Sequence, residues 1–170
     1  MLVLGHGAGG GVGAPDLKEA TAIALEEGVS VALVEQPYRV AGRKSPAPAP
    51  QLDAAWEAVC AQLPLDGATL LVGGRSSGAR VACRTAQAVG AAGVLCLAFP
   101  LHPPGRPEKT RLPELDAVQV PVLIVQGESD PFGMPPEAPG RTIVRLRGNH
   151  SLRSDVNGLR AAVRRFLAAH

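Results

Sequence analysis

The sequence predicts an α/β fold in which a doubly wound, mostly parallel sheet carries helices on both faces. Short apolar runs rich in β-branched residues alternate with longer amphipathic stretches along the 170 residues. Strands buried on both faces have such unbroken apolar runs, and strand–helix alternation is typical of parallel sheets. The predicted strands cover residues 2–4, 29–34, 69–72, 92–97, 120–125 and 142–146.

Helical patterns fill the stretches between these runs. One begins near Leu52 and includes Trp56, and another extends over residues 152–166, with apolar residues three or four positions apart. A third covers residues 16–27 and ends before Gly28, a residue type that often terminates helices.

The composition is typical of one globular domain over residues 1–170. Hydrophobic residues make up 46% and charged residues 19%, which is too apolar for a disordered protein. The net charge is only +2, and no basic run with aromatics indicates a nucleic-acid partner. No apolar run is long enough to span a membrane. We interpret Arg153, Arg160, Arg164 and Arg165 as a solvated helix face, with contact to an anionic partner as the alternative.

The three cysteines give no sign of a metal site. Cys60, Cys83 and Cys96 lie far apart and lack the spacing of metal ligands. Their odd number and the absence of a leader segment predict reduced, packed thiols in a cytoplasmic protein. We expect no cofactor.

Two proline-rich segments, residues 37–50 and 100–113, interrupt the alternation. Both follow a predicted strand and should emerge at the carboxyl edge of the sheet, where open α/β sheets bind ligands. They are either ordinary surface connections or segments that line a site.

The sequence around Ser76 predicts a nucleophile turn. Residues 73–80 read Gly-Gly-Arg-Ser-Ser-Gly-Ala-Arg, which places G-x-S-x-G between a strand and a helix. So sharp a turn requires neighbours almost without side chains, hence Gly74 and Gly78, whose spacing selects Ser76 over Ser77. The following helix N-terminus favours negative charge beside the hydroxyl. The alternative is a glycine-rich loop without chemistry.

A serine hydroxyl needs a base, and that base needs an orienting carboxylate. Of the four histidines we select His150, which follows the last strand, over His102, because the chain order is then Ser…Asp…His. We interpret His6, at the head of a glycine loop, as structural. His170 is the last residue, and we expect it to fray.

Asp130 is the predicted orienting carboxylate. It lies in the loop after the strand at residues 120–125, which neighbours the His150 loop if consecutive strands are adjacent. Glu128 is the alternative, and an aspartate before proline also occurs as a plain turn former.

Acyl transfer also needs two N–H donors for the developing oxyanion. We assign one to the backbone of Ser77. The other is expected from Ala8 or Gly9, in the glycine loop after the first strand.

The same glycine loop carries a rival interpretation. Residues 5–10 fit G-x-G-x-x-G after a strand, and Glu35 ends the second strand, which is the outline of a dinucleotide-binding site. Glu35 comes somewhat late for this role, and the rival leaves Ser76, Asp130 and His150 unexplained.

Three motifs, GHGAGG at residues 5–10, GGRSSG at 73–78 and PLHPPG at 100–105, resemble those of α/β-hydrolases, specifically the dienelactone-hydrolase-like branch. They are similar to a group that includes a testis-expressed protein, a subunit of a histone-acetyltransferase regulatory complex and bacterial relatives. The resemblance covers nearly the whole chain. It implies Ser76 as nucleophile, Asp130 as acid and His150 as base.

The resemblance further implies a minimal, lidless hydrolase with six strands in the order 2-1-3-4-5-6. Such folds usually begin with two more strands, whereas this chain starts at the third. The strand from Val29 to Val34 would then be an uncovered, uncharged edge that invites pairing. We therefore expect either a homodimer through this strand or a longer natural protein.

The predicted function is cleavage of a small ester, thioester or activated amide through an acyl-enzyme. Arg75, beside Ser76, either attracts a carboxylate-bearing substrate or pairs with Glu35 or Asp53. His102 is a further candidate for substrate contact. The alternative is a catalytically silent interaction module with the same fold.

Overall fold

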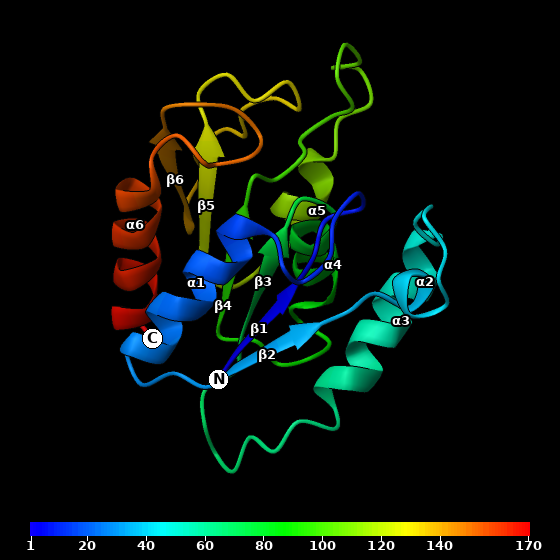
Figure 1. The fold of residues 1–170 in the computed structure, drawn as a ribbon, viewed down its shortest axis with the longest axis vertical. Helices are drawn as coiled ribbons and strands as arrows, with labels where there is room; N and C mark the ends of the chain where they lie inside the picture. The colour runs from blue at the N-terminus through cyan, green and yellow to red at the C-terminus, as the bar shows by residue number, and fades with distance from the viewer.

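The computed structural model describes all of residues 1–170 and contains one six-stranded sheet between two layers of helices (Figure 1). All strands are parallel and lie in the order β2-β1-β3-β4-β5-β6, as predicted. The strands are β1 Leu2–Gly5, β2 Val31–Val34, β3 Leu71–Arg75, β4 Gly93–Leu97, β5 Val122–Gly127 and β6 Arg141–Leu146.

Helices α1 and α6 cover one face of the sheet, and α3, α4 and α5 lie on the other (Figure 1). The short α2 follows β2 at the edge of the sheet. The bounds are α1 Pro15–Glu26, α2 Pro37–Val40, α3 Ala49–Cys60, α4 Ser77–Thr85, α5 Leu112–Asp116 and α6 Val156–Ala168. The sheet is thus doubly wound, and the loops at its carboxyl edge stay free of helical cover.

The ends of some elements differ from the prediction. The last helix begins at Val156 because the Asp155 side chain accepts a hydrogen bond from Gly158 N at 2.8 Å and caps it there. Leu152 is buried, but it lies in the preceding loop with φ of +52°. Gly28 follows α1 with φ of +74°, as expected for a residue that ends a helix.

Apolar side chains fill both faces of the sheet. Trp56 and Phe99 are fully buried on the side of α3 and α4, and Leu17 and Leu159 on the side of α1 and α6. Burial of one such side chain stabilises the fold by about 1.5–3 kcal/mol. The two cores hold the strands, and with them the positions of the loops at the carboxyl edge.

The three cysteines are free and buried, as expected for packed thiols. Burial raises the pKa of the Cys60 thiol to about 11, with a smaller contribution from Glu57. At neutral pH this thiol therefore stays protonated and acts as an apolar packing group.

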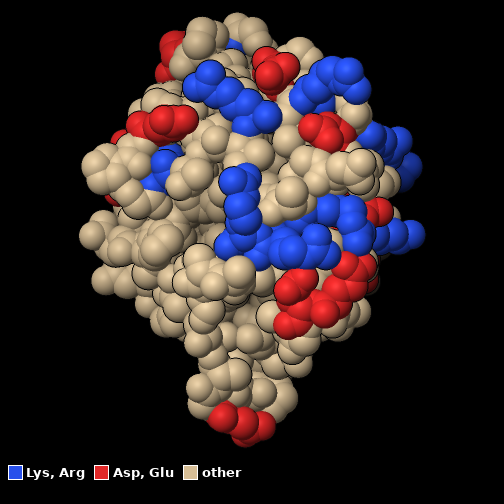
Figure 2. Space-filling model, turned by 90° about the vertical axis from the view of Figure 1, so that its left-hand side faces the viewer, with Lys and Arg blue, Asp and Glu red and all other residues tan.

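Two arginines of α6 pair with acidic residues within and just after α1. Arg160 contacts Glu19 and Glu26, each at 2.8 Å, and Arg164 contacts Glu27 at 2.6 Å. Figure 2 shows this side of the molecule, where basic and acidic side chains lie next to one another. Arg160 and Arg164 are thus paired within the chain, whereas Arg153 precedes α6 and, contrary to expectation, is not part of the helix. None of the helices has the length and apolar content needed to cross a bilayer.

Strand β2 forms an open edge of the sheet and pairs only with β1. It is shorter than the predicted strand, and its Leu33 is 40% exposed. An uncharged edge with unpaired backbone groups favours pairing with another strand. Homodimer formation through this edge stays a prediction.

Replacing Leu33 with lysine tests this pairing. A charged side chain on an edge strand opposes addition of a further strand, so Leu33→Lys should be monomeric where the wild-type chain is dimeric. Sedimentation velocity across a range of concentrations measures the change. Leu25→Lys is the matched control, because Leu25 is 60% exposed but lies on α1. A wild-type chain that stays monomeric up to high concentration would contradict the prediction.

Candidate active site

Ser76 occupies a strained turn between β3 and α4. Its backbone has φ of +52° and ψ of −110°, a combination that costs a residue other than glycine about 1–3 kcal/mol. Two hydrogen bonds hold it: Ser76 N donates to Leu97 O at 2.9 Å, and Arg80 N donates to Ser76 O at 3.2 Å. The turn predicted from G-x-S-x-G is therefore present, with Ser76 at its apex.

The two glycines of this turn are required by close contact with the end of β1. A Cβ atom added at Gly78 would overlap the Gly5 carbonyl group, and one added at Gly74 would lie 2.5 Å from Gly5 O. Only glycine lets the two backbones approach so closely. This contact places the loop that follows β1 directly beside Ser76.

Ser76, His150 and Asp130 form a continuous chain of hydrogen bonds. The Ser76 hydroxyl donates to His150 Nε2 at 3.0 Å, and His150 Nδ1–H donates to Asp130 Oδ2 at 2.8 Å. The three side chains come from the loops after β3, β6 and β5. Glu128, the alternative carboxylate, is exposed.

Asp130 is held by groups that the sequence analysis did not identify. Its side chain is only 1% exposed and accepts hydrogen bonds from Gln126 Nε2 and from Phe132 N, both at 2.9 Å. The Phe132 ring lies 4.3 Å from the His150 ring, centroid to centroid. A glutamine within the apolar run of β5 was the available signal, because such a residue needs a buried partner.

Ala8, Gly9 and Ser77 line the same cavity as Ser76 and His150. Ser77 is the first residue of α4, so its N–H precedes the first intrahelical hydrogen bond. The N–H groups of Ala8 and Gly9 donate no hydrogen bond within the protein. The three residues assigned to the oxyanion site are thus brought together, with backbone donors free.

The glycine loop is oriented through its carbonyl groups. His6 is fully buried; its Nδ1–H donates to Gly7 O at 2.8 Å, and its Nε2 accepts from Gln36 N at 2.9 Å. Tyr38 donates its hydroxyl hydrogen to Ala8 O at 3.2 Å. Fixing a carbonyl also fixes the N–H of the next residue, because the peptide group is planar. The structural interpretation of His6 is confirmed.

The cavity at Ser76 has a volume of about 400 Å³ and is open to solvent. Pro46 and Ala47 contribute to its wall from the first proline-rich segment, and Pro100 and Arg111 from the second. Both proline-rich segments therefore contribute to the wall of the cavity that holds Ser76.

Arg75 pairs with neither Glu35 nor Asp53, so the expected salt bridge was wrong. Its Nε lies 2.9 Å from Oδ2 of Asp16, and its Nη2 donates to the His150 backbone carbonyl at 3.2 Å. Burial raises the pKa of Asp16, with the Arg75 cation opposing that rise. This ion pair could not be predicted from the sequence, because its formation depends on where α1 begins relative to the β3–α4 turn.

His102 is not among the residues that line the Ser76 cavity. Its Nδ1–H donates to Pro103 O at 2.9 Å, and its ring packs against Gly133. His102 therefore shapes the second proline-rich segment, and the structure does not bring it together with the other candidate residues.

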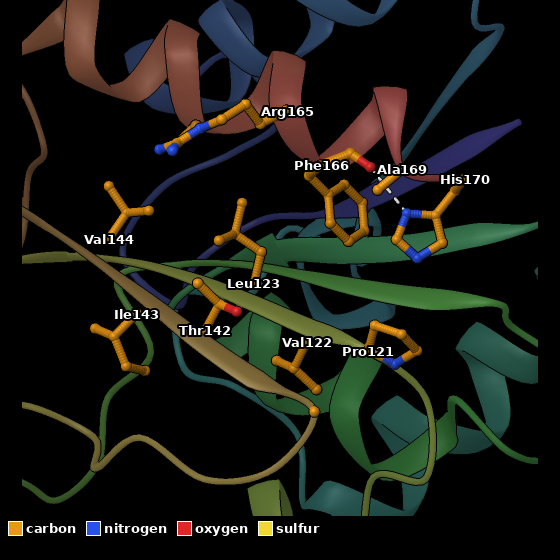
Figure 3. Close-up of a pocket in the computed structure, with 12 residues that line it drawn as sticks. Pro121, Val122, Leu123, Thr142, Ile143, Val144, Arg165, Phe166, Ala169 and His170 are labelled. Carbon is orange, nitrogen blue, oxygen red and sulfur yellow. Dashed lines mark hydrogen bonds between the residues drawn. The ribbon is translucent and has the colours of Figure 1, made fainter.

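His170 does not fray as expected. Its Nδ1–H donates to Phe166 O at 2.8 Å, and the two rings lie 4.7 Å apart. Figure 3 shows both residues at a second cavity of about 500 Å³ between β5, β6 and α6. This cavity adjoins the first residues of β5 and β6, at the edge opposite Ser76, and its lining is mainly apolar.

The glycine loop fits a dinucleotide poorly. A dinucleotide places its pyrophosphate at the N-terminus of the first helix, but α1 carries the buried Asp16 in its first turn. A carboxylate there repels phosphate. No three His, Cys, Asp or Glu side chains gather into a group that could hold a metal ion.

A family comparison agrees with this geometry. Residues 1–154 match the model of a family described as alpha/beta hydrolase domain. The chain belongs to this family. No curated protein matches the chain.

Several solved structures share the fold of this alpha/beta hydrolase domain. An alpha/beta superfamily protein from Xanthomonas campestris pv. campestris has a TM-score of 0.77 at 18% identity, with 99% of this chain and 98% of that one covered. A lidless serine hydrolase from Xanthomonas campestris has a TM-score of 0.76 at 20% identity, with 99% of this chain and 81% of that one covered. Est1E from Butyrivibrio proteoclasticus, with ferulic acid bound, has a TM-score of 0.76 at 17% identity, with 99% of this chain and 88% of that one covered.

The contact at Gly78 predicts a large loss of stability on substitution. Gly78→Ala should lower the free energy of unfolding by about 1–3 kcal/mol, because the added methyl group meets backbone that cannot give way. Urea unfolding measures the difference. Gly10→Ala is the control, since a Cβ there meets nothing within 4 Å. Equal stability of the two variants would show that the turn can relax.

Proposed function

We propose that this alpha/beta hydrolase domain is a serine hydrolase that cleaves a small ester, thioester or activated amide. Ser76 is the nucleophile, His150 the general base and Asp130 the carboxylate that orients the base. The hydrogen-bond chain from Ser76 through His150 to the buried Asp130 is the observation that carries the proposal.

In the acylation step, Ser76 Oγ attacks the carbonyl carbon of the substrate, and its proton passes to His150 Nε2. Asp130 stabilises the resulting imidazolium through the Nδ1–H hydrogen bond. When the tetrahedral intermediate collapses, the bond to the leaving group breaks, and the leaving atom takes the proton from Nε2. The products are an acyl-Ser76 ester and a free alcohol, thiol or amine.

In the deacylation step, water attacks the acyl carbon while His150 Nε2 accepts one of its protons. Collapse of the second intermediate breaks the bond to Ser76 Oγ, which recovers its proton from Nε2. The acid leaves, and the hydroxyl, imidazole and carboxylate return to their starting states.

Two backbone N–H groups stabilise the oxyanion of both intermediates. Ser77 provides one, and Ala8 or Gly9 provides the other from the loop fixed by His6 and Tyr38. Loss of one such donor costs about 3–4 kcal/mol of transition-state stabilisation in other enzymes.

The open cavity favours small or extended acyl substrates. Residues of α3 and α4 line it without closing it off from solvent, and the neighbour from Butyrivibrio proteoclasticus binds ferulic acid, a small carboxylic acid. Three further points stay predictions. They are the closer relation to dienelactone-hydrolase-like proteins and to the group with the testis-expressed protein, the cytoplasmic location, and the absence of nucleic-acid, membrane and cofactor partners.

Labelling with a fluorophosphonate probe tests the nucleophile. The probe reacts with an activated serine, so wild-type protein should be labelled and Ser76→Ala should not. Ester hydrolysis by Ser76→Ala or His150→Ala should fall by roughly 10⁴- to 10⁶-fold, because the two residues act as a unit. In-gel fluorescence and initial rates provide the two measurements.

Ser30→Ala is the matched control for labelling, since Ser30 is exposed and precedes β2, on the opposite edge of the sheet from the cavity. It should be labelled like wild type. A folded wild-type protein that takes up no label would instead favour the interaction module, in which the same fold presents a surface without catalysis.

Removing the Tyr38 hydroxyl tests how the glycine loop is oriented. Tyr38→Phe deletes the hydrogen bond to Ala8 O, so the next N–H should be aimed less well at the oxyanion. We expect kcat to fall by up to about 10-fold with little change in KM, since the loss acts on the transition state. A change confined to KM would contradict this role.

A further inference from the structure

Four guanidinium groups line the Ser76 cavity, and no carboxylate does. They belong to Arg75, Arg80, Arg84 and Arg111. Such a wall is unusual for a site that binds only neutral esters, because like charges held close together destabilise one another. The partners of each arginine therefore decide how much positive charge remains for a ligand.

Arg80 and Arg84 have their charges balanced by carboxylates behind the wall. Arg80 forms a two-pronged contact with Glu114, at 2.8 and 2.5 Å. Arg84 forms a similar contact with Asp53, at 2.8 and 2.6 Å, and also reaches Glu114 at 3.3 Å. This bidentate geometry fixes both guanidinium groups and offsets their charges.

Arg75 is balanced as well, by the buried carboxylate of Asp16. Four guanidinium groups thus share three carboxylates, those of Asp16, Asp53 and Glu114. The wall keeps one unbalanced positive charge.

Arg111 carries that charge. It forms no ion pair, and its side chain makes one hydrogen bond, from Nη1 to Pro100 O at 2.8 Å. Burial and the neighbouring Arg80 cation lower the pKa of Arg111, and the attraction of Glu114 offsets this only in part. A guanidinium group has five N–H donors, so most of those on Arg111 remain for a ligand.

We propose that the cavity takes acyl substrates bearing an ionised carboxylate, and that Arg111 binds this carboxylate while Ser76 attacks the ester or thioester carbon. The inference rests on the proposed function and names its substrate class. One unbalanced guanidinium matches a single negative charge, which favours a carboxylate over a doubly charged phosphate. Arg75, the arginine next to the nucleophile, is excluded from this role by Asp16.

Two esters that differ only in charge test the proposal. Mono-4-nitrophenyl adipate carries a free carboxylate, and 4-nitrophenyl adipamate carries a neutral amide in its place. Wild-type kcat/KM should be about 10- to 100-fold higher for the anionic ester, the range of one charge-assisted hydrogen bond. This ratio should shrink as sodium chloride is raised, because salt screens a partly exposed charge pair.

Variants of Arg111 separate charge from shape. Arg111→Met should bring the two kcat/KM values within about twofold by lowering only the value for the anionic ester, and Arg111→Lys should restore part of the ratio. Arg106→Met is the matched control, since Arg106 is exposed on the same segment and does not line the cavity. Thermal unfolding checks that each variant is folded.

The inference is overturned if wild type hydrolyses both esters equally well, or if the preference survives in Arg111→Met. Binding to Ser76→Ala provides a readout that does not need catalysis. In calorimetry, the Ser76→Ala variant should bind monomethyl adipate more tightly than dimethyl adipate. The double variant Ser76→Ala/Arg111→Met should show no such preference. If binding depends on Arg111 but the wild-type protein takes up no fluorophosphonate label, the proposed hydrolase function is refuted and the anion site stands. If wild type is labelled but shows no preference for the anionic ligand, the anion site is refuted and the hydrolase function stands.

Discussion

The site depends on a contact between two backbones. Gly74 and Gly78 pack against Gly5 with no room for a side chain, and this fixes the β3–α4 turn on the end of β1. Since α1 and α4 lie on opposite faces of the sheet, the loops after β1 and β3 diverge at this point, which is the switch point where open α/β sheets bind ligands. The strain at Ser76 persists because this packing determines it, and the strain in turn exposes the hydroxyl.

The base reaches this turn from the other half of the sheet. Asp130 and His150 follow β5 and β6, while Ser76 follows β3, so the hydrogen-bond chain must pass across the end of β4. Gln126 supports the chain from within β5, where it binds Asp130 as well as the carbonyl groups of Phe99 and Gly133. A buried strand residue moves little, so the carboxylate that orients the base is held by the sheet itself.

Local patterns predicted most of this arrangement from the sequence. The turn at Ser76 and the meeting of three distant loops follow from motif spacing and from strands that run parallel, whereas the strand order followed from the resemblance to α/β-hydrolases. The charge pairs could not be predicted in the same way. Arg75 has several carboxylates within plausible reach along the chain, and its choice of Asp16 depends on where α1 begins above the sheet. The observed ends of some helices and strands differ from the predicted ones for a similar reason. The hydrogen bond from the Asp155 cap sets the start of α6, whereas the spacing of apolar residues predicted an earlier start.

The distribution of charge around the cavity explains why Arg75, the arginine beside the nucleophile, is unsuited to binding a substrate carboxylate. Arg75 joins three segments: it is the last residue of β3, it approaches Asp16 at the start of α1, and it binds the backbone carbonyl of His150 after β6. A ligand that took over its guanidinium group would leave the buried Asp16 without a counter-charge and would release the loop that carries the base. Recognition of an anion therefore falls to a cation that has no carboxylate partner and whose removal leaves the hydrogen-bond chain intact, and of the arginines lining the cavity only Arg111 meets both conditions.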